Sequence, residues 1–312
     1  MMPKKNNEGV RLVRVSRDHQ GQRLDNFLSA QLKGVPRSAV YRMIRTGQVR
    51  INGARARAAT RLNEEDEVRI PPARIRGEQS VAVSEQVREQ LRSATLYEDA
   101  DLLVVDKPAG MAVHAGSGLP WGLIDALRQD RPGEYLELAH RLDRETSGCL
   151  VLARNGPALA HLSAQFRDGQ VRKFYLCLMN GRMPQAVLEV DAPLARRPED
   201  AGGHVEVHAE GKPSRTRFRE LRQFDDCTYA EAELLTGRTH QIRAHARHLG
   251  LALAGDRKYA DRESLKRWKE RGLNRIFLHA HRLVLESPNG TELEFDAILP
   301  DSLRRVLDVL ER

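Results

Sequence analysis

The most concentrated group of chemically active side chains in this 312-residue sequence is HRLDRETSG, positions 140–148. A polar loop that feeds a buried strand is a common place for catalytic groups, and the apolar run GCLVLA follows here. Arg141 and Arg144 flank Asp143 and favour its ionised form. An ionised carboxylate can act as a nucleophile or a base, but not as an acid. On this segment alone, an ion-paired surface turn is an equally good interpretation.

A second group of polar side chains lies in GRTHQIRAHARHLG, positions 237–250. Its composition predicts a helix over roughly 239–249, which Thr239 can cap. Arg243 and Arg247 are four residues apart and share one face of this helix. Two arginines at that spacing suit a phosphate or a carboxylate partner.

Metal and cofactor chemistry are not expected from this sequence. The three histidines of the 237–250 segment lack the HExxH pattern of helical zinc sites, and no nearby carboxylate completes a set of ligands. Cys149, Cys177 and Cys227 lie far apart and form neither a disulfide framework nor a Cys-x-x-Cys site. The sequence contains no P-loop, dinucleotide-binding glycine motif or serine nucleophile elbow.

The composition also indicates where the protein acts. Hydrophobic residues make up 40% of the chain, which is enough for a folded core. No apolar run approaches about 18 residues, so no transmembrane helix is predicted. The first residues are polar and lack the apolar centre of a secretory signal. The chain is therefore expected in the cytoplasm and away from membranes.

The elements that must position these groups predict an α+β domain. From Thr95 onward the sequence contains many short β-rich runs, and helical stretches interrupt them without regular alternation. Those stretches lie near 121–130, 156–168, 239–249 and 261–271. Tyr175 falls in a predicted strand, one residue after Phe174 and facing the opposite side. A strand tyrosine is ordinarily a core residue, and this one matters only if it lines the same cleft as Asp143.

The net charge of the chain is concentrated at its N-terminus. Residues 1–80 contain 17 Lys and Arg against 8 Asp and Glu, a balance of +9, whereas residues 81–312 contain 34 against 35. This asymmetry predicts a polyanion-binding module joined to a nearly neutral domain. We expect a flexible arm at 1–15, a basic domain at 16–80, a linker at 81–94 and the larger domain at 95–312.

The basic domain contains patterns for two short helices and a small sheet. Leu24, Phe27 and Leu28 repeat at helical spacing, and the Asn52-Gly53 pair predicts a hairpin. The second helix carries three arginines that can follow a phosphate backbone: Arg37, Arg42 and Arg45. A solvated charged face is the alternative, but the one-sided charge favours nucleic acid. Aromatic residues are sparse, which favours recognition of shape and backbone over base stacking.

HRLDRETSG and the strand behind it resemble the signature of the RluA family of pseudouridine synthases. Four further segments fall in that family's order and approximate spacing: DKPAGMAVH, RKFYLCLMNG, GRTHQIRAHARHLG and RIFLHAHRLVL. The series from RLDNFL to YRMIRTGQVRING resembles the alpha-L RNA-binding fold. The resemblance covers nearly the whole chain, and it is greatest to the branch of the family that acts on the large ribosomal subunit.

This resemblance implies a small alpha-L RNA-binding module followed by a catalytic domain with a mixed, mainly antiparallel sheet, flanking helices and a central cleft. It implies isomerisation of uridine to pseudouridine in 23S rRNA, either free or in an assembling large subunit. The nucleotide would be flipped out of the folded RNA and attacked by an aspartate carboxylate. No metal or cofactor is implied, and a monomer is expected.

Several residues take roles from the resemblance. Asp143 corresponds to the catalytic aspartate, which attacks either the ribose or the base. Tyr175 corresponds to a tyrosine that stacks on the bound base and can help to deprotonate it, and Arg243 to the basic residue that pairs with the aspartate. Besides the three arginines of the N-terminal helix, the other expected substrate-binding residues are Leu278 near the base, Arg141 in the space left by the flipped nucleotide, Arg247 and His140.

Two other functions fit parts of the sequence. One is a non-catalytic RNA-binding or ribosome-assembly factor, and the intact set of Asp143, Tyr175 and Arg243 argues against it. The other is a related synthase that acts on tRNA or another RNA, and the N-terminal module argues for a large structured rRNA instead.

Overall fold

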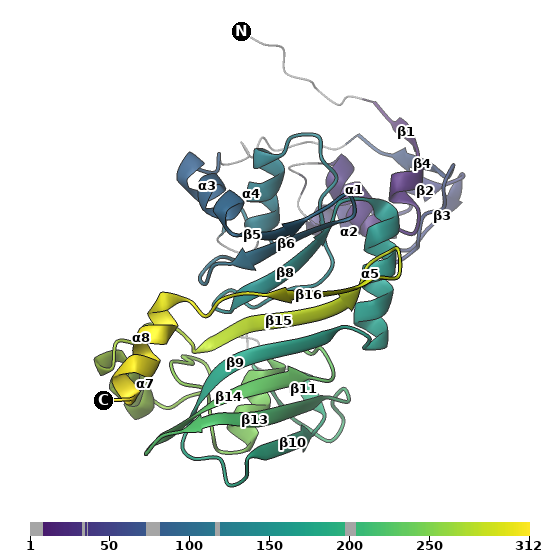
Figure 1. Ribbon diagram of the computed structural model, residues 1–312. Helices are drawn as coiled ribbons and strands as arrows, with labels where there is room; N and C mark the ends of the chain where they lie inside the picture. Colours follow the sequence, from purple (N-terminus) through teal and green to yellow (C-terminus); the bar gives the residue numbers. More distant parts are fainter. Residues whose placement is uncertain (1–8, 33–34, 36, 73–81, 116–118, 197–203) are drawn as a thin grey trace.

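The computed structural model describes residues 9–32, 35, 37–72, 82–115, 119–196 and 204–312. They form a small N-terminal domain and a larger domain built around one long sheet (Figure 1). Both domains combine helices with mostly antiparallel sheets, so the predicted α+β class is confirmed.

The N-terminal domain packs two helices, α1 (Leu24–Gln31) and α2 (Arg37–Arg45), against a four-stranded sheet. The sheet has the order β1-β4-β2-β3, with β1 (Arg11–Arg14), β2 (Arg50–Ile51), β3 (Ala54–Arg55) and β4 (Glu67–Ile70). Phe27 and Leu28 of α1 share a buried core with Val40 of α2, as their helical spacing predicts. The Asn52-Gly53 hairpin between β2 and β3 is confirmed, with both residues at positive φ.

The chain enters this domain earlier than the sequence suggested. Residues 1–15 were expected to be an arm; residues 1–8 lie outside the described part, but β1 pairs antiparallel with β4 from Arg11 to Arg14. Val15 directly after β1 is 1% exposed. Polar residues surround this short alternating strand in the sequence; Val13 of the strand and Val15 after it pack into the core of the domain, whereas Leu12 is exposed.

The larger domain is built on a ten-stranded sheet among the described residues. Its main path is β10-β13-β14-β9-β15-β8-β6-β5, while β16 pairs with β15 and β7 with β8. Among the strands that the structure describes, only the β15–β8 pair is parallel, so a mixed, mainly antiparallel sheet is confirmed. The strands are β5 (Thr95–Glu98), β6 (Leu102–Lys107), β7 (Glu137–Leu138), β8 (Ser147–Ala153), β9 (Arg172–Asn180), β10 (Val187–Asp191), β13 (Arg215–Gln223), β14 (Cys227–Leu234), β15 (Leu278–Glu286) and β16 (Glu292–Asp296). A separate pair is formed by β11 (Leu194–Arg196) and β12 (Val205–Val207).

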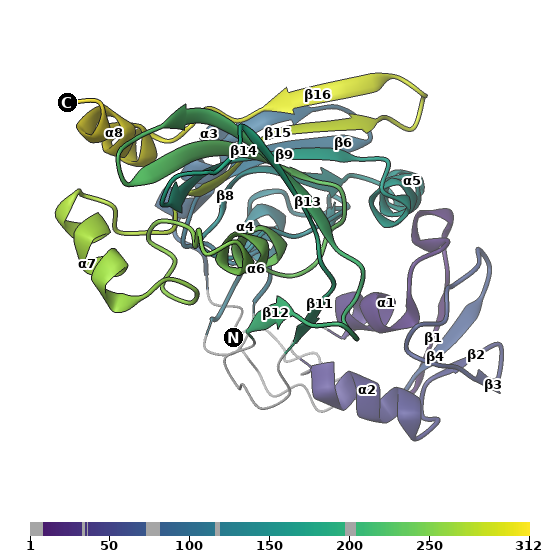
Figure 2. The ribbon, with the colours of Figure 1, turned by 90° about the horizontal axis from the view of Figure 1, so that it is seen from below.

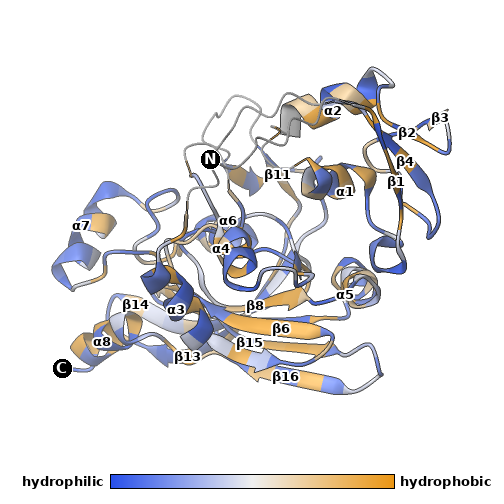
Figure 3. Cartoon of the chain, turned by 90° about the horizontal axis from the view of Figure 1, so that it is seen from above, coloured by the Kyte–Doolittle hydropathy of each residue, from blue (hydrophilic) through white to orange (hydrophobic). Residues whose placement is uncertain are grey.

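Different helices cover the two faces of this sheet. α4 (Leu123–Asp130) and α6 (Gln241–His248) pack on one face, and α5 (Gly156–Asp168) packs on the other. Because strand side chains alternate, Leu103 packs on the α4 side and Leu102 on the α5 side. The central strands β6 and β8 are accordingly hydrophobic along most of their length (Figure 3). α7 (Arg262–Glu270) and α8 (Asp301–Leu310) share a smaller core around Trp268.

The predicted linker belongs to the larger domain. Within residues 81–94, Glu85–Ser93 form the helix α3, which packs beside α4. Leu91 is 1% exposed and Val83 is 3% exposed, and both lie in the main core. Because this segment is charged and buries few apolar side chains, its composition is that of a linker, and the prediction of a linker is wrong.

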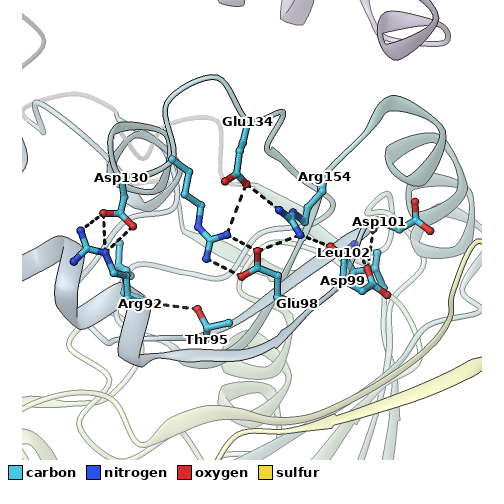
Figure 4. Close-up of polar contacts among 11 residues, drawn as sticks. Arg92, Thr95, Glu98, Asp99, Asp101, Leu102, Asp130, Glu134 and Arg154 are labelled. Atoms are coloured by element: carbon cyan, nitrogen blue, oxygen red, sulfur yellow. Dashed lines mark hydrogen bonds and ion pairs between the residues drawn. The ribbon is translucent and has the colours of Figure 1, made fainter.

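Ion pairs join α3 and the end of α4 to the edge of the sheet (Figure 4). Arg131 donates two hydrogen bonds to Glu98 of β5, at 2.6 and 2.8 Å. Arg154, which follows β8, lies 3.1 Å from the same carboxylate and donates to Glu134 at 3.0 Å. Arg92 of α3 pairs in the same way with the C-terminal residue of α4. Such networks fix the position of α4, one wall of the core beneath the cleft.

The N-terminal domain contacts the larger domain through the 3-10 turn η1 (Arg17–His19), which lies against α5. The ring of His19 meets Tyr135 edge-on, with centroids 6.3 Å apart. Figure 2 shows α1 and α2 on the side of the sheet that carries α4, α6 and the β11–β12 pair. The basic helix α2 therefore lies on the same side of the sheet as the second basic segment of the sequence.

Candidate active site

A cleft with a cavity volume of about 300 Å³ opens on the α6 side of the sheet. This volume is at the lower end of the range for small-ligand pockets and suits one nucleotide unit rather than a large cofactor. Its walls come from the loop before β8, from β9 and β15, and from the segment that leads into α6. Six of the residues predicted from the sequence line it: His140, Arg141, Asp143, Tyr175, Arg243 and Leu278.

Backbone and lysine hydrogen bonds hold the loop that carries Asp143 in place. The amide of Thr146 donates to the Asp143 carbonyl at 3.1 Å, which closes a turn. Lys107, which is fully buried, donates through Nζ to the carbonyls of Pro108 and Met111 at 2.9 Å and of Arg144 at 3.1 Å. Burial lowers the pKa of Lys107 to about 7. DKPAG, the start of a segment that carries the family resemblance, thus supports the Asp143 loop.

Asp143 is paired with Arg243, 100 residues away in the sequence. Arg243 Nη1 donates to Asp143 Oδ2 at 3.0 Å, while its Nε and Nη2 donate to the two oxygens of Asp256 at 2.8 Å each. Burial opposes the charge of Arg243, but the two carboxylates outweigh it and hold its pKa above the ordinary value. Arg243 is therefore a fixed cation that holds the Asp143 carboxylate by Oδ2 in the lining of the cleft.

Tyr175 and Leu278 form the floor of the cleft on neighbouring strands. Leu278 pairs in register with Cys177, two residues from Tyr175, so both side chains point to the same face of the sheet. Burial, and then the charge of Asp143, raises the pKa of Tyr175 above its ordinary value, so the phenol stays protonated. This favours Tyr175 as a flat apolar wall over a role as a base.

Comparison with known proteins gives the same assignment. A sequence model of the family described as RNA pseudouridylate synthase matches residues 101–248, and a model of the S4 domain matches residues 22–68. Ribosomal large subunit pseudouridine synthase C of Yersinia pestis is 44% identical, over 99% of this chain and 98% of its own length. The chain belongs to the RNA pseudouridylate synthase family.

Other members of the family agree. The protein named ribosomal large subunit pseudouridine synthase C in Escherichia coli (strain K12) is 43% identical to this synthase over 96% of this chain and 97% of its own. Among solved structures, human RNA pseudouridylate synthase domain containing 4 has a TM-score of 0.61 at 26% identity, and the match covers 72% of this chain and 96% of that chain. The predicted enzyme class, an RNA pseudouridine synthase and hence an isomerase, and the N-terminal RNA-binding module are confirmed.

His240 of the synthase starts α6 and touches the Asp143–Arg243 pair. It is the N-cap residue at φ 54°, in place of the expected Thr239. Its Nε2 lies 3.7 Å from Asp143, and its Nδ1 lies 3.0 Å from the hydroxyl of Tyr259. Burial lowers the pKa of His240 to about 4, so the ring is neutral near pH 7 and contributes no ion pair to Asp143.

His140 and Arg141 occupy different positions in the cleft. His140 Nε2 accepts a hydrogen bond from the Val151 amide at 3.0 Å, and its ring stacks on Phe166 with centroids 4.5 Å apart. Burial lowers the pKa of His140 to about 3, so it serves as a neutral brace between the loop and β8. Arg141 is exposed where it lines the cleft, as an RNA-contacting side chain must be.

The remaining predicted residues lie elsewhere. Arg247 is exposed outside the cleft lining and donates to the Tyr259 carbonyl at 2.6 Å. Arg42 and Arg45 are exposed on α2, whereas the side chain of Arg37 lies outside the described residues. Asp256 and Lys173 were not among the predicted site residues. Lys173 lies in RKFYLCLMNG, one of the segments that carry the family resemblance, but the burial of both residues is visible only in the folded structure.

Metal ligands and membrane spans are both missing from the part of the chain that the structure describes. Within it, no three His, Cys, Asp or Glu side chains are grouped so that they could hold a metal ion. None of its helices has both the length and the apolar character needed to cross a bilayer.

Gly148, the last residue of HRLDRETSG, fixes where the loop meets the sheet. Its φ is +114°, and a Cβ there would lie 2.2 Å from the Ala280 carbonyl oxygen on the parallel neighbour β15. Gly148→Ala should therefore lower the free energy of unfolding by about 3 kcal/mol or more, since strained backbone alone costs roughly 1–3. Chemical denaturation measures this. Gly169→Ala is the control, because Gly169 also has a positive φ but open space around it; an equal loss for both would show that β15 moves aside.

Proposed function

We propose that the enzyme converts specific uridines of 23S rRNA to pseudouridine, as a cytoplasmic monomer, with Asp143 as the attacking carboxylate. The observation that carries the catalytic part is the Asp143–Arg243 pair at 3.0 Å inside a nucleotide-sized cleft. The substrate part is supported by relatives named for the large ribosomal subunit, which are 41–44% identical over at least 96% of this chain.

The cleft suits a flipped nucleotide. The glycosidic carbon of a uridine is inaccessible inside folded RNA, so the nucleotide must leave the stack at a cost of a few kcal/mol. Asp143, held by Arg243, would attack the target either at the ribose or at the base. Tyr175 would stack on the uracil, and Leu278 beside it would exclude water. Detached or rotating uracil would then stay close to the ribose until the carbon–carbon bond forms.

Mapping pseudouridines in cells that lack the protein tests the proposal. We expect one or more sites in 23S rRNA to lose the modification, to regain it with the wild-type gene, and to stay unmodified with Asp143→Asn. Lost sites in tRNA alone would contradict the rRNA assignment. Unchanged pseudouridines everywhere would favour a non-catalytic RNA-binding factor.

The N-terminal domain is proposed to hold the rRNA by its phosphates. Arg42 and Arg45 are exposed on α2, on the side of the sheet that carries α6 (Figure 2). Replacing both with Gln should weaken binding of an rRNA fragment and reduce the slope of log Kd against log salt by about 1 per arginine. Titrations at several salt concentrations measure the slope. The matched control is Arg304→Gln with Arg305→Gln on α8, far from α2 (Figure 1); an equal change in that variant would show only a loss of net charge.

A further inference from the structure

A buried lysine lines the same cleft without a counter-ion. Lys173 is the second residue of β9, two before Tyr175, so both side chains lie on the cleft face of the strand. Only 7% of Lys173 is exposed. Among the residues that the structure describes, none forms a hydrogen bond or an ion pair with its ammonium group.

A largely buried ammonium group without a carboxylate partner is costly, and a ligand in the cleft would offset that cost. Burial lowers the pKa of Lys173, and no carboxylate offsets the effect. The adjacent His140 is neutral, because burial and then the charge of Lys173 lower its pKa to about 3. Lys107, the other buried lysine among the described residues, needs no ligand because three carbonyls accept from its ammonium group. Lys173 has no such acceptors and lines the cleft.

The position of Lys173 in the cleft determines which part of a bound uridine its ammonium group can reach. Lys173 lies two residues before Tyr175 on β9, about 7 Å along the strand, and lines the cleft together with His140 and Phe166. If Asp143 faces the glycosidic bond and the uracil lies on Tyr175, the far end of the ring, which carries O4, extends toward Lys173.

We propose that Lys173 donates a hydrogen bond to O4 of the target uracil and stabilises the negative charge that develops there. This rests on the proposed isomerisation of uridine. Lys173 would then be a catalytic residue that stabilises charge on the uracil, a role that neither the Asp143 loop nor Arg243 of α6 fills. It would also disfavour cytosine, whose amino group at that position is itself a donor.

Charge reaches O4 by either route of attack. When the C1′–N1 bond breaks, its electron pair stays on the uracil and is shared among N1, O2 and O4. When the carboxylate adds to C6 instead, the C5–C6 pair moves through C4 onto O4. In both routes the C1′–N1 bond is replaced by a C5–C1′ bond, the bond to the Asp143 carboxylate breaks again, C5 releases its proton and N1 takes one up, so the net reaction is an isomerisation. A fixed donor at O4 strengthens as the charge grows, as an oxyanion-hole donor does.

The test compares Lys173→Met, which keeps length and burial but removes the donor, with Arg172→Met on the neighbouring, exposed position of β9. With a synthetic RNA spanning a mapped target, Lys173→Met should lower the single-turnover rate by about 10²-fold, as loss of one oxyanion donor does. Its Kd for the RNA should stay within about twofold. The thermal midpoint should stay level or rise, because an unpaired buried cation is removed; Arg172→Met should change none of these.

Sulfur substitution in the target identifies the contacted atom. Sulfur accepts hydrogen bonds weakly, so with 4-thiouridine the rate penalty of Lys173→Met should shrink to about threefold or less, whereas with 2-thiouridine it should persist. A wild-type rate in Lys173→Met, a defect confined to Kd, or an undiminished penalty with 4-thiouridine would each overturn the O4 contact. Wild-type enzyme without activity on rRNA would overturn the proposed function and this inference together, whereas an active wild type with an equally active variant overturns only the inference.

Discussion

Asp143→Asn should reduce pseudouridine formation by roughly 10³-fold or more, since loss of an attacking group removes the step on which all the other groups act. The amide keeps the size of the carboxylate and can still accept a hydrogen bond from Arg243. Because Asp143 is only partly buried and contributes little to the core, the fold and the Kd for rRNA should be preserved. Chemical labelling of pseudouridine in single-turnover reactions measures the loss, and binding titrations measure the Kd.

Two further variants sharpen this result. Asp143→Glu retains the charge but shifts it by one methylene, and a misplacement of about 1 Å can cost about 10²-fold; it should therefore also fail. Asp226→Asn is the matched control, because Asp226 is likewise paired with an arginine, Arg271 at 2.9 Å, but lies outside the cleft. Normal product formation by Asp143→Asn would remove this carboxylate from the mechanism.

The sequence was most informative where the functional residues are neighbours in the chain. HRLDRETSG brings a carboxylate, cations and a glycine together beside an apolar strand, so the residues made Asp143 a candidate, and the family resemblance then favoured it over an ion-paired surface turn. Its partner was different. Arg243 was recognised as a ligand for some anion from helical spacing, but that the anion is Asp143 came only from the family resemblance, because the contact joins residues 100 positions apart.

The residues that were missed depend on burial. Asp256 is 1% exposed and lies in the plain segment AGDRKY, and Lys173 follows another basic residue at the start of β9. Lys173 belongs to the family segment RKFYLCLMNG and Asp256 to no recognised segment, and neither was singled out, since Lys173 matters through the cleft that the fold creates and Asp256 through its contact with Arg243. The same limit applies to β1 and α3, where a few apolar side chains among many charges proved sufficient to anchor a strand and a helix. Tertiary packing decides such cases, and local composition does not.

Arg243→Lys should lower kcat/KM by roughly 10²-fold or more while leaving the Kd for rRNA within a few-fold. Lysine keeps the charge, but its single ammonium cannot donate two parallel bonds to Asp256 and a third to Asp143. The carboxylate of Asp143 would lose its fixed orientation, which matters for attack and much less for binding. The separation of kcat/KM from Kd is therefore the decisive measurement.

Asp256 makes a second test of the same unit possible. It is buried, and it holds Arg243 through two bonds of 2.8 Å without lining the cleft. Asp256→Asn should thus lower the rate through Arg243, and combining it with Arg243→Lys should cost far less than the product of the two single effects. Arg243→Met is the less suitable change, because an unpaired buried carboxylate destabilises a protein by about 3–5 kcal/mol. If Arg243→Lys weakened only RNA binding, and its effect simply multiplied with that of Asp256→Asn, Arg243 would be a phosphate contact and Asp143 would need another group to orient it.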